Sequence, residues 1–192
     1  TEMEHHSNII PWQLICERTG ANLKYIPIHE AGTLDLSNPE KYFTNKTKIV
    51  CVIHQSNVFG TVNRITEIMK LAHEVGALVL VDGAQSTPHH RVNVTELNCD
   101  FFAFSGHKMM GPTGVGALYT KPEILEAMNP FLGGGEMIRK VTLEGSTWND
   151  IPWKFEAGTP NIAQVIGLGS AIDYINKTGM DNITNYENVL LN

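Results

Sequence analysis

A lysine with polar neighbours follows directly on the apolar run Phe101-Phe102-Ala103-Phe104. The motif is Ser105-Gly106-His107-Lys108, and a glycine-rich stretch, Gly111-Pro112-Thr113-Gly114-Val115-Gly116, comes next. A buried lysine loses part of its affinity for a proton and becomes a competent amine nucleophile. Such an amine forms a Schiff base with an aldehyde cofactor, and serine, histidine and backbone N–H groups suit the phosphate of pyridoxal 5'-phosphate (PLP). The motif therefore predicts a PLP site in which Lys108 is the Schiff-base residue.

An aspartate ends a second apolar run upstream of this motif. The residues Ala77 to Val81 predict a strand buried on both faces, and Asp82 follows it. PLP acts as an electron sink only while its pyridine nitrogen is protonated, and a carboxylate maintains that proton. Lys108 comes 26 residues after Asp82, which leaves room for a connection and one more strand. Neighbouring parallel strands would present both side chains at the same edge of the sheet, where α/β proteins bind ligands.

Each of these residues also has an ordinary structural explanation. An aspartate at a strand end usually forms a turn or caps a helix, and a lysine after a strand usually extends into solvent. The combination favours the cofactor site, because Asp82 and Lys108 occur in this order and Ser-Gly-His precedes the lysine.

Five segments, in order and without large gaps, resemble the SUF-type cysteine desulfurases and the similar selenocysteine lyases. These enzymes belong to the class V aminotransferase group of PLP enzymes. The segments are Glu4-His5-His6-Ser7-Asn8, Ser56-Asn57-Val58-Phe59-Gly60-Thr61, Val81-Asp82-Gly83-Ala84-Gln85, Ser105-Gly106-His107-Lys108 and Phe155-Glu156-Ala157-Gly158-Thr159-Pro160-Asn161. The resemblance implies an α/β fold of the PLP-dependent transferase fold type I.

The resemblance implies roles around the cofactor ring. Lys108 would hold the cofactor as a Schiff base and later move protons at the substrate carbon. Asp82 would hold the pyridine N–H, and Gln85 would reach the phenolic oxygen of the ring. His5 would stack its imidazole on the ring and take part in catalysis, since a flat aromatic group suits that face.

The resemblance also implies contacts to the phosphate and the substrate. Ser105 and His107 would bind the phosphate, and Asn57 would orient the adduct of substrate and cofactor. Thr159 would reach the phosphate of the partner subunit in a homodimer.

The activity implied by the family is the conversion of L-cysteine to L-alanine, with L-selenocysteine as a related substrate. The sulfur would leave as a persulfide and pass to an acceptor protein for iron–sulfur cluster assembly. The family's upstream glycine/threonine turn, substrate-binding arginine and mobile-loop cysteine have no counterpart in this chain, since Cys16, Cys51 and Cys99 fall in or beside regular elements. We therefore expect a fragment of the large domain that is inactive in isolation.

Two other interpretations remain open at this point. One is a different class V PLP enzyme, such as an aminotransferase, an epimerase or a kynureninase-like lyase, which a downstream cysteine would distinguish. The other is a truncated chain that folds without turning over.

Composition narrows the classes of function. The chain has 192 residues, of which 42% are hydrophobic, and suits one α/β domain or most of a larger one. A net charge of −6 offers no basic stripe for nucleic acid and no polybasic patch for a membrane. Three cysteines without framework spacing favour a reducing cytoplasm. The pairs His5-His6 and His89-His90 lack zinc spacing, so no metal site is expected.

The hydrophobic pattern predicts alternating helices and strands, and hence a mainly parallel sheet covered by helices. Helices are expected over 8–18, 61–75, 121–128, 161–177 and from 181, with a short helix near 39–43. Strands are expected over 22–28, 48–54 and 116–120 and in the runs that end at Asp82 and Ser105.

The domain division follows from the resemblance. Residues 1–178 would form the central part of the PLP-binding large domain, and 179–192 the start of the connection to a smaller C-terminal domain. The stretch 131–153 shows little periodicity. It is expected either as a surface loop or as a segment near the active-site mouth and the dimer partner.

Overall fold

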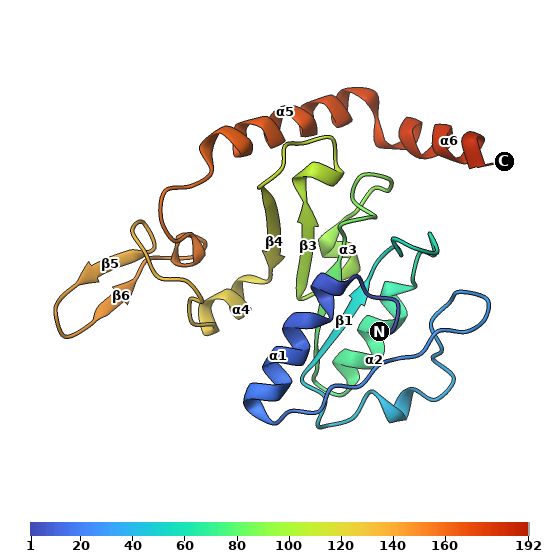
Figure 1. The fold of residues 1–192 in the computed structure, drawn as a ribbon, viewed down its shortest axis with the longest axis horizontal. Coiled ribbons are helices and arrows are strands. Elements are labelled where there is room, and N and C mark those ends of the chain that lie inside the picture. Colours follow the sequence, from blue (N-terminus) through green and yellow to red (C-terminus); the bar gives the residue numbers. More distant parts are fainter. Residues whose placement is uncertain (192) are drawn as a thin grey trace.

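The computed structural model of this chain describes residues 1–191, and its centre is a four-stranded sheet (Figure 1). A separate two-stranded hairpin stands apart from it. The strands are β1 (Ile49–Ile53), β2 (Leu78–Asp82), β3 (Phe101–Ser105), β4 (Gly116–Thr120), β5 (Ile138–Val141) and β6 (Ser146–Trp148).

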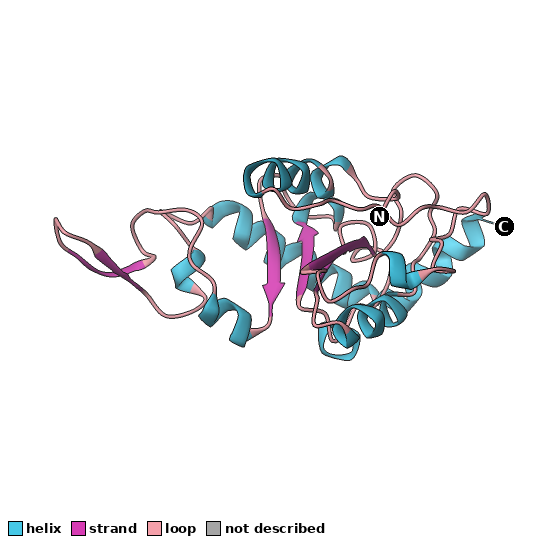
Figure 2. Cartoon of the chain, turned by 90° about the horizontal axis from the view of Figure 1, so that it is seen from below, coloured by secondary structure: helices cyan, strands magenta, loops and turns pink. Residues whose placement is uncertain are grey.

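Helices lie on both faces of the sheet (Figure 2). The α-helices are α1 (Ile10–Thr19), α2 (Ile65–Glu74), α3 (Val94–Leu97), α4 (Pro122–Ala127), α5 (Ile162–Thr178) and α6 (Met180–Leu191). Four short 3₁₀ turns are η1 (His6–Asn8), η2 (Pro39–Lys41), η3 (Gly106–Lys108) and η4 (Trp153–Phe155). The expected α/β fold with a mainly parallel sheet is confirmed.

The sheet order β1-β2-β3-β4 brings three strand ends to one edge. Strands β1, β2 and β3 are parallel, with Ile53 opposite Asp82 and Asp82 opposite Ala103. Strand β4 runs antiparallel to β3 and pairs Gly116 with Ser105. The carboxyl ends of β2 and β3 and the start of β4 therefore meet at the same edge, where Asp82 and Ser105 end their strands.

Helix α2 covers the β1–β2 part of the sheet with an apolar face. Its buried residues recur at helical spacing and pack into the same core as the strands; they are Ile65, Ile68, Met69 and Ala72. The helix begins at Ile65, later than the expected residue 61. Val62 forms a β-bridge with Gln55, and the Asn63 side chain donates to the Ile53 carbonyl at 2.8 Å, so both residues are bound to the end of β1 and not to the helix.

The strand expected over 22–28 is wrong. Residues 22–27 belong to no strand, and Ile28 alone makes an isolated bridge, with Leu34. Pro27 has no N–H to donate to a neighbouring strand. Ile26 supplies the apolar signal, because it is buried in the core without belonging to the sheet.

The stretch 131–153 contains the β5–β6 hairpin. A surface loop or a segment near the active-site mouth is expected here from the sequence, and no strands are predicted. The hairpin extends away from the four-stranded sheet, as Figures 1 and 2 both show. Lys154, just beyond it, is buried and donates from Nζ to the carbonyls of Leu125 and Glu126 at 2.9 and 3.0 Å. This lysine ties the base of the hairpin segment to the end of α4, where helix carbonyls lack intrahelical partners.

A sharp break separates the two C-terminal helices. Helix α5 ends at Thr178, Gly179 adopts φ +87°, and α6 begins at Met180. Few residues other than glycine adopt this backbone conformation. The break coincides with the boundary expected at residue 178, and the division into domains at this point stays a prediction.

A buried aspartate joins three elements by hydrogen bonds at the opposite edge of the sheet. Asp100 is 3% exposed, and its carboxylate accepts hydrogen bonds from Val79 N at 2.7 Å and from His73 Nε2 and Lys121 Nζ at 2.8 Å each. Burial alone would raise the pKa of Asp100, but the bonds from Lys121, His73 and Val79 outweigh it and hold the pKa below its ordinary value of 3.8. The carboxylate thereby joins α2, β2 and the start of α4.

We predict that Asp100→Asn lowers the free energy of unfolding by about 2–4 kcal/mol at pH 7, because His73 and Lys121 lose a buried charge partner. Since the folded pKa lies below the unfolded one, this stabilisation is fully present above the unfolded pKa. It is lost as the pH falls through the folded value. Urea unfolding at pH 7 and below pH 4 measures the difference. The exposed Asp173→Asn serves as the control, and an equal effect of both variants at pH 7 would contradict the assignment.

Candidate functional site

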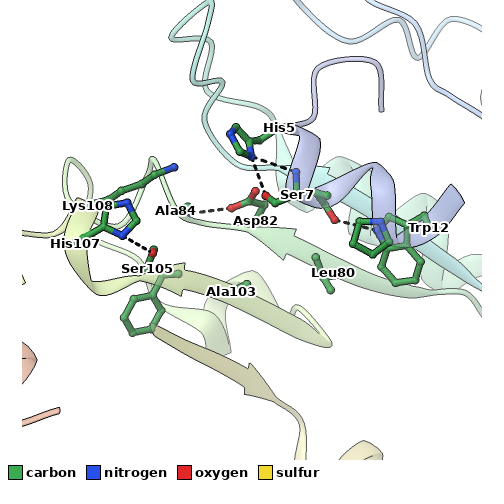
Figure 3. Close-up of a pocket in the computed structure, with 13 residues that line it drawn as sticks. His5, Ser7, Trp12, Leu80, Asp82, Ala84, Ala103, Ser105, His107 and Lys108 are labelled. Atoms are coloured by element: carbon green, nitrogen blue, oxygen red, sulfur yellow. Dashed lines mark hydrogen bonds between the residues drawn. The ribbon is translucent and has the colours of Figure 1, made fainter. Parts of the chain in front are cut away.

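A cavity of about 590 Å³ opens at the carboxyl edge of the sheet, between the strand ends and the η1–α1 segment. Figure 3 shows its lining side chains. They are His5, Ser7, Asn8, Pro11, Trp12, Leu80, Asp82, Ala84, Ala103, Phe104, Ser105, His107 and Lys108.

Asp82 and Lys108 reach this cavity from neighbouring strands. Asp82 is 9% exposed at the end of β2, and its Oδ1 accepts a hydrogen bond from Ala84 N at 2.9 Å. Within residues 1–191, the second carboxylate oxygen has no hydrogen-bond partner, and neither has Lys108 Nζ. Lys108 is half-buried at the end of η3, and its side chain extends toward the side on which His5 and Asp82 lie (Figure 3). An acceptor and an amine are thus both available to a ligand.

The glycine-rich turn after β3 fixes where Lys108 stands. Gly106 N donates to Val115 O at 2.8 Å, and Gly111 N donates to Gly106 O at 2.9 Å, which closes the segment onto itself. A Cβ on Gly111 would lie 2.8 Å from the Gly106 carbonyl oxygen. The turn therefore needs glycine at this position to approach so closely.

Ser105 and His107 form a polar pair beside the lysine. The Ser105 hydroxyl and His107 Nδ1 are 3.0 Å apart and hydrogen-bonded. His107 is exposed and lies on the outer part of the cavity wall. A hydroxyl and an imidazole at this position can donate to the oxygens of an anionic group.

His5 is held by the turn that follows it. Its Nδ1 accepts the Ser7 N–H at 3.2 Å and lies 2.8 Å from the Ser7 hydroxyl. Because a backbone N–H can only donate, Nδ1 carries no proton in this arrangement, and the neutral ring carries its proton on Nε2. The flat ring is thus fixed at the cavity with a defined tautomer.

A histidine behind the site is kept neutral. His54 follows β1, and its backbone N donates to Asp82 O at 2.8 Å. Burial, and secondly the nearby His90, lower the pKa of His54 below its ordinary value of 6.5. The imidazole of His54, the residue that binds the Asp82 carbonyl, is therefore uncharged at neutral pH.

A contact between neighbouring strands sets the position of Asp82. The Phe102 ring of β3 lies against Gly83, where an added Cβ would come within 1.9 Å of the ring. Gly83 N also donates to Ala103 O at 2.8 Å. The turn after Asp82 can follow this path only because residue 83 has no side chain.

The cavity brings together five of the residues that the sequence suggested, namely His5, Asp82, Ser105, His107 and Lys108. The other three do not line it. Asn57 is exposed after β1, Gln85 is half-buried in the turn after Asp82, and Thr159 is exposed before α5.

Sequence reasoning missed Asn8 and Trp12 as lining residues. They stand four residues apart, one helical turn, and Trp12 Nε1 donates to Asn8 Oδ1 at 3.0 Å. That spacing was the available signal, because residues i and i+4 share one side of a helix.

The donor set of the cavity fits PLP. The free amine of Lys108 suits the aldehyde, and the available oxygen of Asp82 suits a protonated ring nitrogen. The Ser105–His107 pair suits the phosphate, and His5 offers a flat ring surface. No group of three metal-ligating side chains is found in the part of the chain that the structure describes. Nor does any helix there have the length and apolarity needed to cross a membrane.

Fold and site define an α/β domain in which an aspartate at the end of one strand and a lysine in the turn after the adjacent parallel strand line one cavity. Residues 1–192 match the model of the aminotransferase class-V family, and the chain belongs to that family. It is 56% identical over 190 residues to a probable cysteine desulfurase of Halalkalibacterium halodurans, covering 99% of this chain and 47% of that protein.

Solved structures agree with this assignment. The apo cysteine desulfurase of Thermococcus onnurineus NA1 matches with a TM-score of 0.93 and 43% identity, over 98% of this chain and 47% of that one. The cystine C-S lyase C-DES, solved with its reaction product cysteine persulfide, matches with a TM-score of 0.82 and 30% identity, over 93% and 49%. The expected fold type I is confirmed, and this chain spans about half the length of these relatives.

The contact at Gly83 leads to a test of how Asp82 is positioned. We predict that Gly83→Ala destabilises the fold by about 1–3 kcal/mol, because the new methyl group overlaps the Phe102 ring. Combining it with Phe102→Leu should recover part of that loss. Denaturant unfolding of the two single variants and the double variant measures the coupling. Simple additivity of the two single effects would show that the ring does not restrict residue 83.

The three cysteines lead to a prediction of reactivity. Burial raises the pKa of the Cys51 thiol to about 12 and, together with the nearby Asp100, raises that of Cys99. At pH 8 only about one Cys51 thiol in ten thousand is then ionised. We expect iodoacetamide to label half-exposed Cys16 first in the native chain, and all three cysteines in denaturant. Rapid native labelling of Cys51, seen by peptide mass spectrometry, would contradict this.

Proposed function

We propose that this chain supplies the PLP site of a cysteine desulfurase, an enzyme that converts L-cysteine to L-alanine and releases the sulfur as a persulfide. The observation that carries the proposal is that Asp82, at the end of β2, and Lys108, in the η3 turn after the adjacent parallel strand β3, line one cavity with His5. The names of the relatives, at 56% and 43% identity, support it.

Lys108 is the catalytic residue in this proposal. Its Nζ would hold the cofactor through the aldehyde and, as a free amine, would move a proton at the substrate α-carbon. When bound, PLP supplies an electron sink for the electron pair left on that carbon. Asp82 holds the proton on the ring nitrogen, which sustains the sink.

The other residues of the site orient and bind. Ser105 and His107 would hold the phosphate, and His5 would offer its flat ring to the cofactor, with its Nε2 proton free to be donated. Gln85 would reach the phenolic oxygen and Asn57 the substrate. Both residues follow strands that end at this edge of the sheet.

In this proposal, the thiol that accepts the sulfur belongs to a part of the whole protein that lies outside residues 1–192. Cys16, Cys51 and Cys99 do not line the cavity, and the raised pKa of Cys51 disfavours a nucleophile there. The arginine for the substrate carboxylate is likewise assigned to another part of the whole protein. The isolated chain is then expected to hold the cofactor without completing the reaction.

The wider setting of the activity follows the same resemblance. We propose a SUF-type enzyme of the cytoplasm that works as a homodimer, in which Thr159 reaches the phosphate bound by the partner subunit. Thr159 is exposed on the segment before α5, which leaves it free for such a contact. The sulfur passes to an acceptor protein for iron–sulfur cluster assembly, and L-selenocysteine is a related substrate.

The second candidate is a PLP-dependent lyase of the same family. The structural likeness to a cystine C-S lyase, at 30% identity, favours it over an aminotransferase or epimerase. The two functions differ in whether a protein thiol accepts the sulfur. Trapping a protein persulfide on the whole enzyme with an alkylating reagent therefore separates them.

We predict that PLP added to the purified chain gives a visible absorption band that Lys108→Ala abolishes. Borohydride should fix the cofactor onto Lys108, where peptide mass spectrometry locates it. Asp82→Asn should retain the covalent bond but weaken cofactor binding by about tenfold to a hundredfold, since a charge-assisted hydrogen bond contributes about 1.5–3 kcal/mol.

Lys140→Ala is the matched control, because Lys140 is exposed on β5 and does not line the cavity. A band of equal strength in Lys108→Ala, or fixation on another lysine, would remove the basis of the proposed function.

A further inference from the structure

A buried carboxylate lies beneath the turn that carries His5. Glu4 is the residue before His5, and its side chain is only 1% exposed. Its Oε2 accepts a hydrogen bond from Asn8 Nδ2 at 2.7 Å. Its Oε1 accepts from the Thr1 hydroxyl and lies 3.3 Å from the Thr1 amino group. None of the roles assigned above uses this carboxylate.

Asn8 links Glu4 to helix α1 by a second hydrogen bond. Asn8 is 8% exposed, and its Oδ1 accepts from Trp12 Nε1 at 3.0 Å. A carboxylate can only accept and an indole N–H can only donate, so one orientation of the Asn8 amide satisfies both partners. Glu4, Asn8 and Trp12 thus form a directed chain of hydrogen bonds, which we call the Glu4 chain.

The Glu4 chain contacts the turn that holds His5 through Asn8. Asn8 N donates to His5 O at 2.8 Å, and the same short turn presents Ser7 N to His5 Nδ1. Asn8 and Trp12 also line the cavity with His5. The same residue thus binds Glu4 through its side chain and the His5 carbonyl through its backbone, which links the buried carboxylate to the turn that fixes the imidazole.

We propose that Glu4 is a positioning residue, which through Asn8 sets the orientation and tautomer of His5 at the candidate cofactor site. This inference rests on the proposed function for its relevance to PLP, but the geometry of His5 is measurable without cofactor. A buried acceptor suits the role, because removing it leaves the Asn8 amide unsatisfied, and that amide then reorients to find a partner.

The first test measures the His5 tautomer in the cofactor-free chain by long-range ¹H–¹⁵N NMR, with His5→Gln identifying the signals. The native chain should show an unprotonated Nδ1 and a protonated Nε2. Glu4→Met should bring the two nitrogen signals toward a common averaged position. Glu4→Gln keeps an acceptor for Asn8 and should retain the native pattern.

The matched control is Glu2→Met. Glu2 is also an acidic residue near the start of the chain, but it accepts a hydrogen bond from Ile28 N and does not contact Asn8. It should leave both His5 signals unchanged. Unchanged His5 signals in a folded Glu4→Met chain would overturn the proposal. If Glu4→Met does not fold, Asn8→Ala takes its place, and failure of both to fold would reject positioning in favour of a structural role.

The second test measures PLP affinity by absorption titration. Glu4→Met should bind about tenfold more weakly than the native chain, while Glu4→Gln and Glu2→Met should match it. If the native chain binds no PLP but the NMR pattern behaves as expected, the proposed function fails and the positioning role stands. Equal affinity of Glu4→Met and the native chain would overturn the role of Glu4 in cofactor binding.

Discussion

The register of three parallel strands is the constraint on which the site depends. Asp82 is placed opposite Ala103, and the Phe102 ring against Gly83 leaves the chain one path out of β2. A shift of one residue would turn Asp82 to the other face of the sheet, because side chains alternate along a strand. The sheet register therefore sets the place of Asp82 and of the end of β3, and the closed turn 106–111 then sets the place of Lys108.

Local sequence signals predicted this part of the molecule well. The runs that end at Asp82 and Ser105 are short, apolar and bounded by polar or glycine residues, and such strands are specified by their own composition. The segment 22–28 has a similar apolar pattern but forms no strand, because Pro27 lacks an N–H and Ile26 is buried in the core outside the sheet. The hairpin at 138–148 has little apolar periodicity, because both of its strands are largely exposed.

The residues of the candidate site also fall into those that local sequence signals predicted and those that they did not. Asp82, Ser105 and Lys108 were found because each ends or closely follows a strand, so position along the chain predicts position in space. Asn8 and Trp12 were missed because their place at the cavity depends on how α1 lies across the sheet. Glu4 is further removed, since its role depends on two hydrogen bonds that no spacing rule requires. Long-range packing carries the information that the sequence pattern lacks.

The antiparallel strand β4 has a consequence for the mobility of Lys108. Because Gly116 pairs with Ser105, the segment 106–115 leaves the sheet and returns to it at the same point. Both ends of the segment are anchored, and the contacts of Gly106 with Val115 and Gly111 tighten it further. The conformational entropy of ordering this segment is then lost when the chain folds, before any ligand arrives. A ligand that reacts with the amine has only the side-chain rotamers of one lysine left to order.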